Sequence, residues 1–369
     1  MKHDLSAQGL KKECTVHHRC GGCPLYTTPV QKQQEMICAP ILEWLSQNNI
    51  PMHPKILSFD LWGFRDRCDL QFREGILGLF SRASQDIVAI THCPKIHPLL
   101  NNALSWLWEN PPPLAKASML LRRAPCDTIG LWIDAANIEI KSLLEEATWL
   151  EKAHKVFSIE IGQKHKRILK KENGWTLQKQ PVLFPWFATF LSPNRTVLLY
   201  STIKNFTQPS MRSNMSLVET VYKFIAEHEP MHWLEYGSGT GNFTHMLSQH
   251  AHSISIMEPH PLSRLGLQQG FAQIKPCSYE FISEIQDSIP FEGALLDPPR
   301  NGLGADIHAL ALHRSCRSIV YVSCHFESMK QDMDILLAHG YELVSIQGIA
   351  QFPNTEHCEW VCFLKKSEA

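Results

Sequence analysis

The residues Ser-Ile-Val-Tyr-Val-Ser before Cys324 form a short apolar run that ends in a thiol. A cysteine in such a place is either a small core side chain or a nucleophile held where a strand ends. The apolar runs 253–257 and 293–296 are likewise followed by ionisable residues, Glu258 and Asp297. Ligands of open α/β sheets bind beyond the carboxyl ends of the strands. Because several predicted strand ends carry reactive groups, the pattern favours a nucleophilic thiol.

A carboxylate, Glu359, opens the last apolar run of the sequence. Runs 342–349 and 359–364 have the composition of a terminal β-hairpin, and their connection leads back toward the sheet edge that carries Cys324. A carboxylate beside a nucleophile can remove a proton from a bound substrate. We therefore predict that Glu359 is a general base.

The segment 232–243 reads as an apolar strand, a glycine-rich turn and the start of a helix. The turn carries Gly237, Gly239 and Gly241, and an acid stands near the end of the strand. Three spaced glycines alone are a weak signal, but this order with the acid is typical of methyl-donor folds rather than dinucleotide folds. Glu258 ends the next strand, where an acid can accept hydrogen bonds from both hydroxyls of a ribose.

Three cysteines, Cys14, Cys20 and Cys23, stand within ten residues, and Gly-Gly separates the last two. Twelve cysteines in a chain of this length without a secretion signal favour reduced thiols over a disulfide framework. Cys93 is the best candidate for a fourth ligand. Four thiolates suit either a tetrahedral zinc ion or a 4Fe–4S cluster, and the histidine pair beside them also allows a Cys3His zinc site.

The front half of the sequence is basic and the back half acidic. Residues 1–205 hold 25 Lys and Arg against 18 Asp and Glu, whereas residues 206–369 hold 10 against 18. The run 64–73 alternates apolar and cationic positions, and 164–171 is a second basic run. Unless the asymmetry is chance scatter, it favours contact between the front half and nucleic-acid phosphates. The residues predicted to make it are Arg65, Arg67, Arg73, Lys164, Lys166 and Arg167.

At 369 residues, the chain is long enough for two domains. Residues 1–205 read as a β-rich α+β domain, with a helix over 29–49 and strand-like runs from 117 to 200, including Asn-Ile-Glu-Ile at 137–140. Residues 206–369 read as an α/β domain. The sequence shows no apolar run of eighteen residues and no signal peptide, so we expect a cytoplasmic protein without a membrane segment. We also expect a monomer.

Taken together, these residues resemble the uracil-C5 RNA methyltransferases, the family that makes 5-methyluridine in ribosomal and transfer RNA. The resemblance runs over nearly the whole chain, and its motifs stand in the family's order. The matching segments are Cys-x5-Cys-Gly-Gly-Cys at 14–23 with Cys93, Phe-Thr-Gln-Pro-Ser at 206–210, Asp-Pro-Pro-Arg at 297–300, Tyr-Val-Ser-Cys at 321–324 and Phe-Pro-Asn-Thr-Glu-His-Cys-Glu at 352–359.

The resemblance implies a C-terminal Rossmann-like class I methyltransferase domain, S-adenosylmethionine as the methyl donor, and a 4Fe–4S cluster in the N-terminal domain. It also implies that Cys324 adds to C6 of a uridine and that Glu359 removes the proton from C5. The implied cofactor-binding residues are Gln208, Gly237, Gly239, Gly241, Asn242, Glu258 and Asp297. The implied cluster ligands are Cys14, Cys20, Cys23 and Cys93.

The chain departs from the family pattern at Ser210, at Gly237-Ser238 and at His325-Phe326. These departures leave open a decayed RNA-binding iron–sulfur protein. Cytosine-C5 RNA methylation is a second alternative, disfavoured because Pro299 rather than a cysteine follows Pro298. The cluster cysteines begin near the N-terminus, without the family's TRAM domain before them. This layout is most similar to the ribosomal-RNA branch, so we expect a structured RNA partner, ribosomal ahead of transfer RNA.

Overall fold

The computed structural model describes residues 13–59, 62–162, 166–178, 180–228 and 231–367. The chain forms two compact units that interleave along the sequence. The first unit comprises residues 1–26, 60–187 and 201–211, and the second comprises 27–59, 188–200 and 212–369. Compared with the division predicted after residue 205, residues 27–59 and 188–200 pack with the second unit and residues 206–211 with the first.

The second unit is built on a sheet of eight strands in the order β1-β17-β18-β16-β15-β12-β13-β14. The strands β12 to β16 run parallel, while β18 lies antiparallel between β16 and β17. The strand order reverses direction between β12 and β15, the place where open α/β sheets bind ligands. The strands are β1 Lys55–Leu57, β12 His232–Tyr236, β13 Ser253–Met257, β14 Ser278–Phe281, β15 Gly293–Leu296, β16 Ser318–Ser323, β17 Tyr341–Ile349 and β18 Glu359–Lys366.

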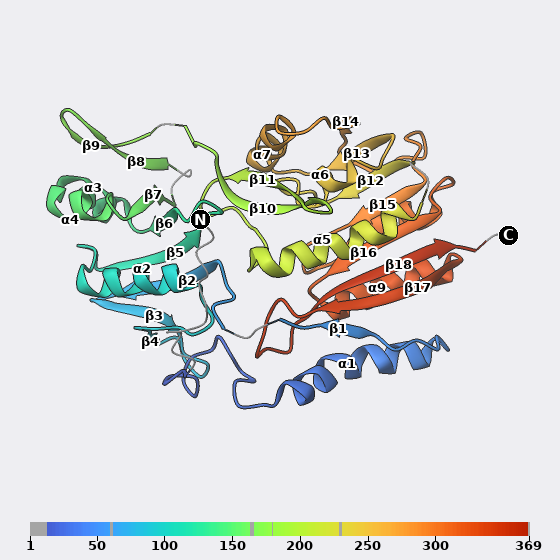
Figure 1. The fold of residues 1–369 in the computed structure, drawn as a ribbon, viewed down its shortest axis with the longest axis horizontal. Helices are drawn as coiled ribbons and strands as arrows, with labels where there is room; N and C mark the ends of the chain where they lie inside the picture. The colour runs from blue at the N-terminus through green and yellow to red at the C-terminus, as the bar shows by residue number, and fades with distance from the viewer. Residues whose placement is uncertain (1–12, 60–61, 163–165, 179, 229–230, 368–369) are drawn as a thin grey trace. The chain divides into compact units, whose positions relative to one another are not determined.

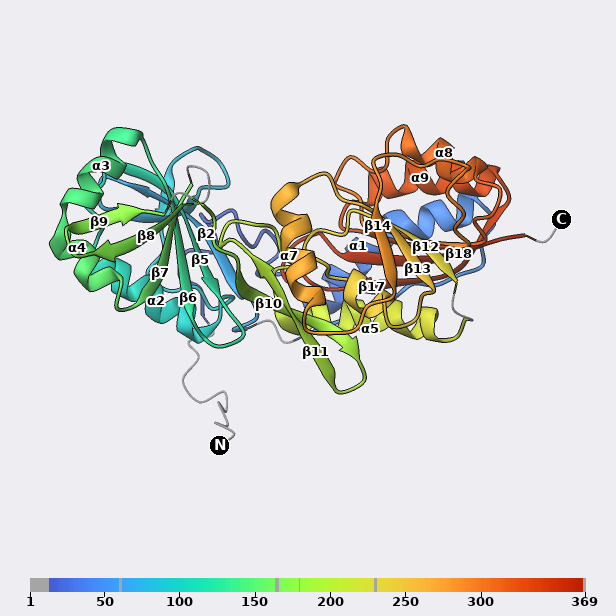
Figure 2. The ribbon, with the colours of Figure 1, turned by 90° about the horizontal axis from the view of Figure 1, so that it is seen from above.

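Helices cover both faces of this sheet, and α5 and α9 lie on opposite sides of it (Figures 1 and 2). Alternate residues of β16 supply the two cores: Tyr321 packs in the cluster that includes α9, and Val320 packs in the cluster that includes α5. Such burial on both faces explains why the central strands are continuously apolar. The helices are α1 Val30–Gln47, α5 Met211–Ala226, α6 Thr244–Leu247, α7 Pro261–Phe271, α8 Asp306–Leu312 and α9 Phe326–Ala338.

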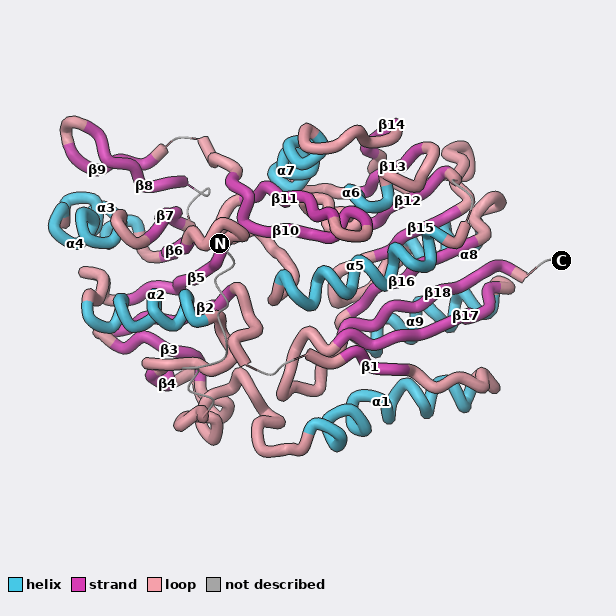
Figure 3. Tube along the Cα trace, in the orientation of Figure 1, coloured by secondary structure: helices cyan, strands magenta, loops and turns pink. Residues whose placement is uncertain are grey.

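The first unit is built on a second eight-stranded sheet, in the order β4-β3-β2-β5-β6-β7-β8-β9, with α2 lying across it (Figure 3). All neighbouring pairs are antiparallel except β6 and β7. The strands are β2 Arg67–Arg73, β3 Ile76–Phe80, β4 Ile87–Ala89, β5 Lys116–Arg123, β6 Ile129–Asp134, β7 Phe157–Ile161, β8 Lys166–Lys171 and β9 Gly174–Leu177. The helices are α2 Pro98–Glu109, α3 Asn137–Glu145 and α4 Ala147–Ala153.

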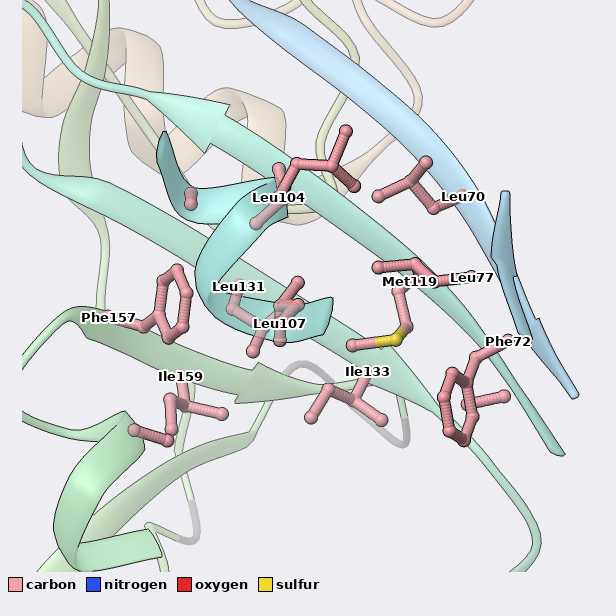
Figure 4. Packing of buried hydrophobic residues seen from close by; sticks show 14 of the residues in the cluster. Leu70, Phe72, Leu77, Leu104, Leu107, Met119, Leu131, Ile133, Phe157 and Ile159 are labelled. Carbon is pink, nitrogen blue, oxygen red and sulfur yellow. The ribbon is translucent and has the colours of Figure 1, made fainter. Parts of the chain in front are cut away.

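The core of the first unit lies between its sheet and its helices, where Leu104 and Leu107 of α2 meet Met119 and Leu131 (Figure 4). The prediction of a strand at 137–140 is wrong, because these residues begin α3. Ile140 and Leu143 are the buried residues of that helix, three positions apart, which is the spacing of one helix face.

A two-stranded sheet joins β10, Phe184–Ser192, to β11, Arg195–Ser201. Asn194 adopts a positive φ of 63° in the turn between them, a conformation that asparagine tolerates well. Searched over its described residues, the chain contains no helix with the length and hydropathy needed to cross a membrane.

Candidate active site

The predicted nucleophile and base lie at one end of the second unit's sheet. Strands β16 and β18 are antiparallel, and their last paired residues are Ser323 and Trp360. One residue beyond that pair, the same register sets Cys324 against Glu359. Cys324 is partly exposed, whereas Glu359 is only 3% exposed. The structure therefore brings together a reachable thiol and a buried carboxyl group.

The Cys324 thiol has a mixed electrostatic environment. Burial raises its pKa above the ordinary value, and the carboxyl groups of Glu359 and Asp297 raise it further. Arg300, from the loop that follows β15, lowers it by charge and by a hydrogen bond. Arg300 is thus the neighbouring group that favours the thiolate, the nucleophilic form of cysteine.

The two neighbouring acids favour their protonated forms. Burial raises the pKa of Asp297 to about 7. Burial also raises the pKa of Glu359 well above its ordinary value, and Asp297 adds to the effect, whereas Gln351 and Arg300 oppose it. Two nearby carboxyl groups cannot both ionise at low cost in a buried site. A group that titrates near neutral pH is suited to proton transfer.

The loop after β15 is held in place by Asp332 of α9. The Leu303 amide donates to Asp332 Oδ2 at 2.9 Å, and the Tyr321 hydroxyl donates to the same oxygen. Gly302, with φ of 74°, leaves room there, because a Cβ would lie 2.8 Å from Asp332 Oδ2. These contacts fix the segment that carries Asp297 and Arg300.

The glycine-rich turn after β12 approaches the same end of the sheet. Gly237, Gly239 and Gly241 all have positive φ. A Cβ on Gly237 would lie 2.3 Å from the Asp297 carbonyl oxygen, so only glycine allows the two loops to come this close. The Gly239 amide donates to Glu258 Oε2 at 2.8 Å, which joins the turn to the end of β13.

Buried polar atoms that lack well-aligned hydrogen bonds gather around this turn. Glu235 is fully buried, and burial raises its pKa to about 8, with Asp297 and Glu258 adding to the rise that Thr244 partly offsets. A buried polar atom without a partner is costly unless water or a ligand satisfies it. Among the described residues, the buried side-chain atoms here that lack a well-aligned hydrogen bond are Asn214 Oδ1, Glu235 Oε1 and Oε2, Ser238 Oγ, Asn242 Oδ1 and Nδ2, Thr244 Oγ1 and His245 Nε2.

A hollow is lined by α7 and by the segment that follows β14. Arg264 and Phe281 line it together with residues 282–284, and the Arg264 guanidinium lies 4.9 Å from the centre of the Phe281 ring. Arg264 also donates to the Glu258 carbonyl. The turn, Glu258 and the hollow therefore offer a glycine cradle, an acid and an apolar ring to an elongated polar ligand.

Gln208, predicted to contact a cofactor, is buried in segment 201–211 of the first unit, so that contact stays a prediction. Arg122 organises this segment: its guanidinium donates to the carbonyls of Thr202, Ile203 and Asn205 and to the Thr207 hydroxyl. Sequence reasoning missed this buried arginine, because a charged residue near the end of a strand is usually exposed.

The predicted cluster ligands gather in the first unit. Burial raises the pKa of Cys20, Cys23 and Cys93, to about 11 for Cys23, and neighbouring thiols among the four predicted ligands add to each rise. Within the described part of the chain, no three His, Cys, Asp or Glu side chains lie close enough to hold a single metal ion. The predicted four-cysteine metal site therefore stays a prediction.

Lys95 lies beside these thiols, and no feature of its local sequence marks it as a site residue. It is 4% exposed, its Nζ has no hydrogen-bond partner among the described residues, and it lies 4.7 Å from the centre of the Trp62 ring. Burial lowers its pKa to about 8, an effect that Cys23 opposes. An anionic group at the four thiols would pair with this buried ammonium group.

The basic residues predicted to bind nucleic acid differ in exposure, and two of them already have partners. The alternation in β2 is confirmed, with Leu70 and Phe72 buried and Arg73 exposed. Arg67 is paired with Asp69 at 3.1 Å, and Arg167 donates to Ser158 at 2.8 Å, so both already have partners.

The other predicted basic residues differ in exposure and surroundings. Arg65 is close enough to Cys23 and Cys93 to lower the pKa of both thiols. Lys166 is half-buried in β8, and Lys164 lies outside the described residues. Of the described set, Arg73 is thus the most accessible cation.

Comparisons with known proteins match this chain to RNA methyltransferases. A family model described as tRNA (uracil-5-)-methyltransferase matches residues 271–367. The chain is 30% identical over 374 residues to an uncharacterized RNA methyltransferase of Bdellovibrio bacteriovorus, covering 96% of each protein. It is 24% identical over 383 residues to the 23S rRNA (uracil(1939)-C(5))-methyltransferase RlmD of Histophilus somni, covering 98% of this chain and 84% of that one.

The fold also matches a solved structure. The tRNA (uracil-54, C5)-methyltransferase of Pyrococcus abyssi, in complex with S-adenosyl-L-homocysteine, superposes with a TM-score of 0.70 over 94% of this chain and 86% of that one. The two sequences are 19% identical. At that identity, the match shows a shared fold.

Proposed function

Because the chain belongs to the uracil-C5 RNA methyltransferase family, we propose that it transfers a methyl group from S-adenosylmethionine to C5 of a uridine in RNA. The observation that carries this proposal is the placement of Cys324 against Glu359 at the end of the sheet. A nucleophile and a base on opposite strands can act on adjacent atoms of one pyrimidine ring.

Each residue of the pair has one task. The Cys324 thiolate forms a bond to C6 of the uracil, which makes C5 electron-rich enough to take a methyl group. S-adenosylmethionine supplies that methyl group when bound. Glu359 then takes the proton from C5, the C5–C6 double bond re-forms, and the bond between sulfur and C6 breaks. Arg300 favours the thiolate at the start and at the end of this sequence.

The turn after β12 fits S-adenosylmethionine. The buried polar atoms around it that lack a well-aligned hydrogen bond would find partners on the amino-acid part of the cofactor, and Glu258 suits the ribose hydroxyls. A positively charged sulfonium group would oppose the effect of burial on Glu235 and Asp297 and favour their ionised forms. We assign cofactor contacts to Gly237, Gly239, Gly241, Asn242, Glu258 and Asp297, and to Gln208 on the family resemblance.

A 4Fe–4S cluster is the group proposed for Cys14, Cys20, Cys23 and Cys93. Each thiolate of such a cluster binds a different iron atom, so its cysteines stand farther apart than the ligands of one zinc ion. The buried ammonium group of Lys95, which has no hydrogen-bond partner among the described residues, supports an anionic group at these thiols. Methyl transfer requires no electron, so we assign the cluster a structural role.

Protein purified without oxygen should contain close to the four iron atoms per chain of a 4Fe–4S cluster and absorb broadly in the visible range. Cys20→Ser should lose most of this iron, because it removes one cluster ligand. Cys126→Ser, at an exposed thiol outside the group, should keep it. Iron and sulfide assays with an absorption spectrum make the measurement. A colourless protein with one zinc ion per chain would contradict the proposal.

The substrate proposed is a uridine in a loop or flipped out of ribosomal RNA, since a stacked base is not accessible to the pair. The near-full-length relative in Histophilus somni is named for 23S rRNA, which supports ribosomal over transfer RNA. Arg65, Arg67, Arg73, Lys164, Lys166 and Arg167 are the proposed phosphate contacts.

The function is tested by incubating the purified chain and S-adenosylmethionine with unmodified ribosomal and transfer RNA transcripts, followed by nucleoside mass spectrometry. We expect 5-methyluridine in the ribosomal transcript. 5-Methylcytidine would instead indicate the cytosine-directed alternative. A protein that neither methylates RNA nor binds the cofactor in calorimetry would indicate the decayed one.

A further inference from the structure

Gln351 is a fully buried glutamine beside the proposed base. It follows β17 by two residues, and its Nε2 donates to Glu359 Oε2 at 3.3 Å. Its Oε1 accepts a hydrogen bond from the Ser213 hydroxyl at 2.8 Å. Ser213 is also fully buried, in the first turn of α5. The side chain therefore links this helix to the carboxyl group of Glu359.

Ser213 determines which end of the amide faces the carboxyl group. An ionised carboxylate can only accept hydrogen bonds, so the NH2 end of the amide must face it. The oxygen end then needs a donor, and the Ser213 hydroxyl supplies one. Without that donor, the amide could turn and present its oxygen to the carboxylate, which is unfavourable.

The surroundings of Glu359 make this donor important. The charged or titratable groups near it are Asp297 and Arg300 from the loop after β15, Cys324 after β16, and Cys358. Burial and Asp297 disfavour the ionised form of Glu359, while Gln351 and Arg300 favour it. Arg300 is exposed, so water screens its charge, whereas the hydrogen bond from Gln351 is buried.

We propose that Gln351, fixed by Ser213, is a positioning residue that holds Glu359 ionised and in place to remove the C5 proton. This inference rests on the proposed function and adds a residue that the family motifs leave out. Gln351 contacts the base and not Cys324, so its loss slows the release of methylated RNA from Cys324 and does not slow the addition of Cys324 to the RNA.

The test is Gln351→Met, with adduct formation and adduct release measured separately by rapid quenching over about pH 6 to 9. Removal of the donor destabilises the carboxylate and raises the pKa of Glu359. The variant should therefore reach a given release rate only at a higher pH than the wild type. We expect release to slow about tenfold or more near neutral pH and to recover as the pH rises. Adduct formation should not slow, because a less ionised Glu359 raises the pKa of Cys324 less. Gln347→Met, the same change in β17, should leave both rates and the pH profile unchanged.

Ser213→Ala should move the pH profile of release in the same direction by a smaller amount. It replaces Gln351→Met as the test if that variant fails to fold. Release that slows equally at every pH, or does not slow, would overturn the inference, because a purely structural glutamine has no reason to shift a pH profile. A wild-type protein that forms no adduct would overturn the proposed function instead, so the two failures are distinguishable.

Discussion

A Cys324→Ala variant is expected to form no covalent complex with RNA and to lose methyl transfer by at least about 10⁴-fold. The reason is that uracil C5 becomes reactive only while sulfur is bonded to C6, and the other thiol beside Glu359, that of Cys358, is buried. Transfer of a labelled methyl group to a ribosomal RNA transcript measures the loss.

The matched control for this change is Cys277→Ala, a partly buried cysteine between α7 and β14. It should keep full activity. Cofactor binding by Cys324→Ala should also stay unchanged in calorimetry, because the thiol is assigned to the RNA base and not to the cofactor. If Cys324→Ala retains activity, the covalent mechanism is wrong.

A Glu359→Gln variant is expected to accumulate a protein–RNA complex that survives denaturing electrophoresis. Cys324 can still add to the uracil, but the amide cannot take the proton from C5, so the bond to sulfur does not break. Turnover should fall by about 10² to 10⁴-fold, the usual contribution of a general base. Gel shift under denaturing conditions and mass spectrometry of the adduct make the measurement.

Glu356→Gln is the control, since Glu356 is exposed in the same connection between β17 and β18. It should turn over normally and accumulate no complex. A Glu359→Gln variant that releases methylated RNA at the wild-type rate would assign proton removal to another group, and Asp297, with its pKa near 7, would be the first to test.

Much of this site could be predicted from the sequence, because each of its reactive residues lies directly beside the apolar run that forms its strand. Apolar runs that end in Asp297 and Cys324 are strands with reactive ends, and an antiparallel hairpin returns Glu359 to the same edge. A hairpin after a parallel strand has few registers that keep its apolar residues buried. The placement of Cys324 against Glu359 then follows from the same pattern.

The contacts that the sequence did not reveal depend on distant segments. Gln351 meets a serine 138 residues earlier in the chain, and no local pattern marks either side chain. Lys95, after Cys93-Pro94, reads as an ordinary surface lysine until the fold buries it. Arg67 is a different case, since its partner Asp69 lies two residues away on the same strand face, and the pairing could have been expected.

The edge of the second unit's sheet has a consequence for how the protein is made. Strand β1 pairs with β17, so that Lys55 lies beside Gln347, and α1 packs in the same core as α9. A ribosome delivers β1 long before its partner exists, and pairings this far apart in sequence form slowly. The nascent chain therefore carries an unmatched edge strand for nearly its whole synthesis, and that edge can close only when the last segments emerge.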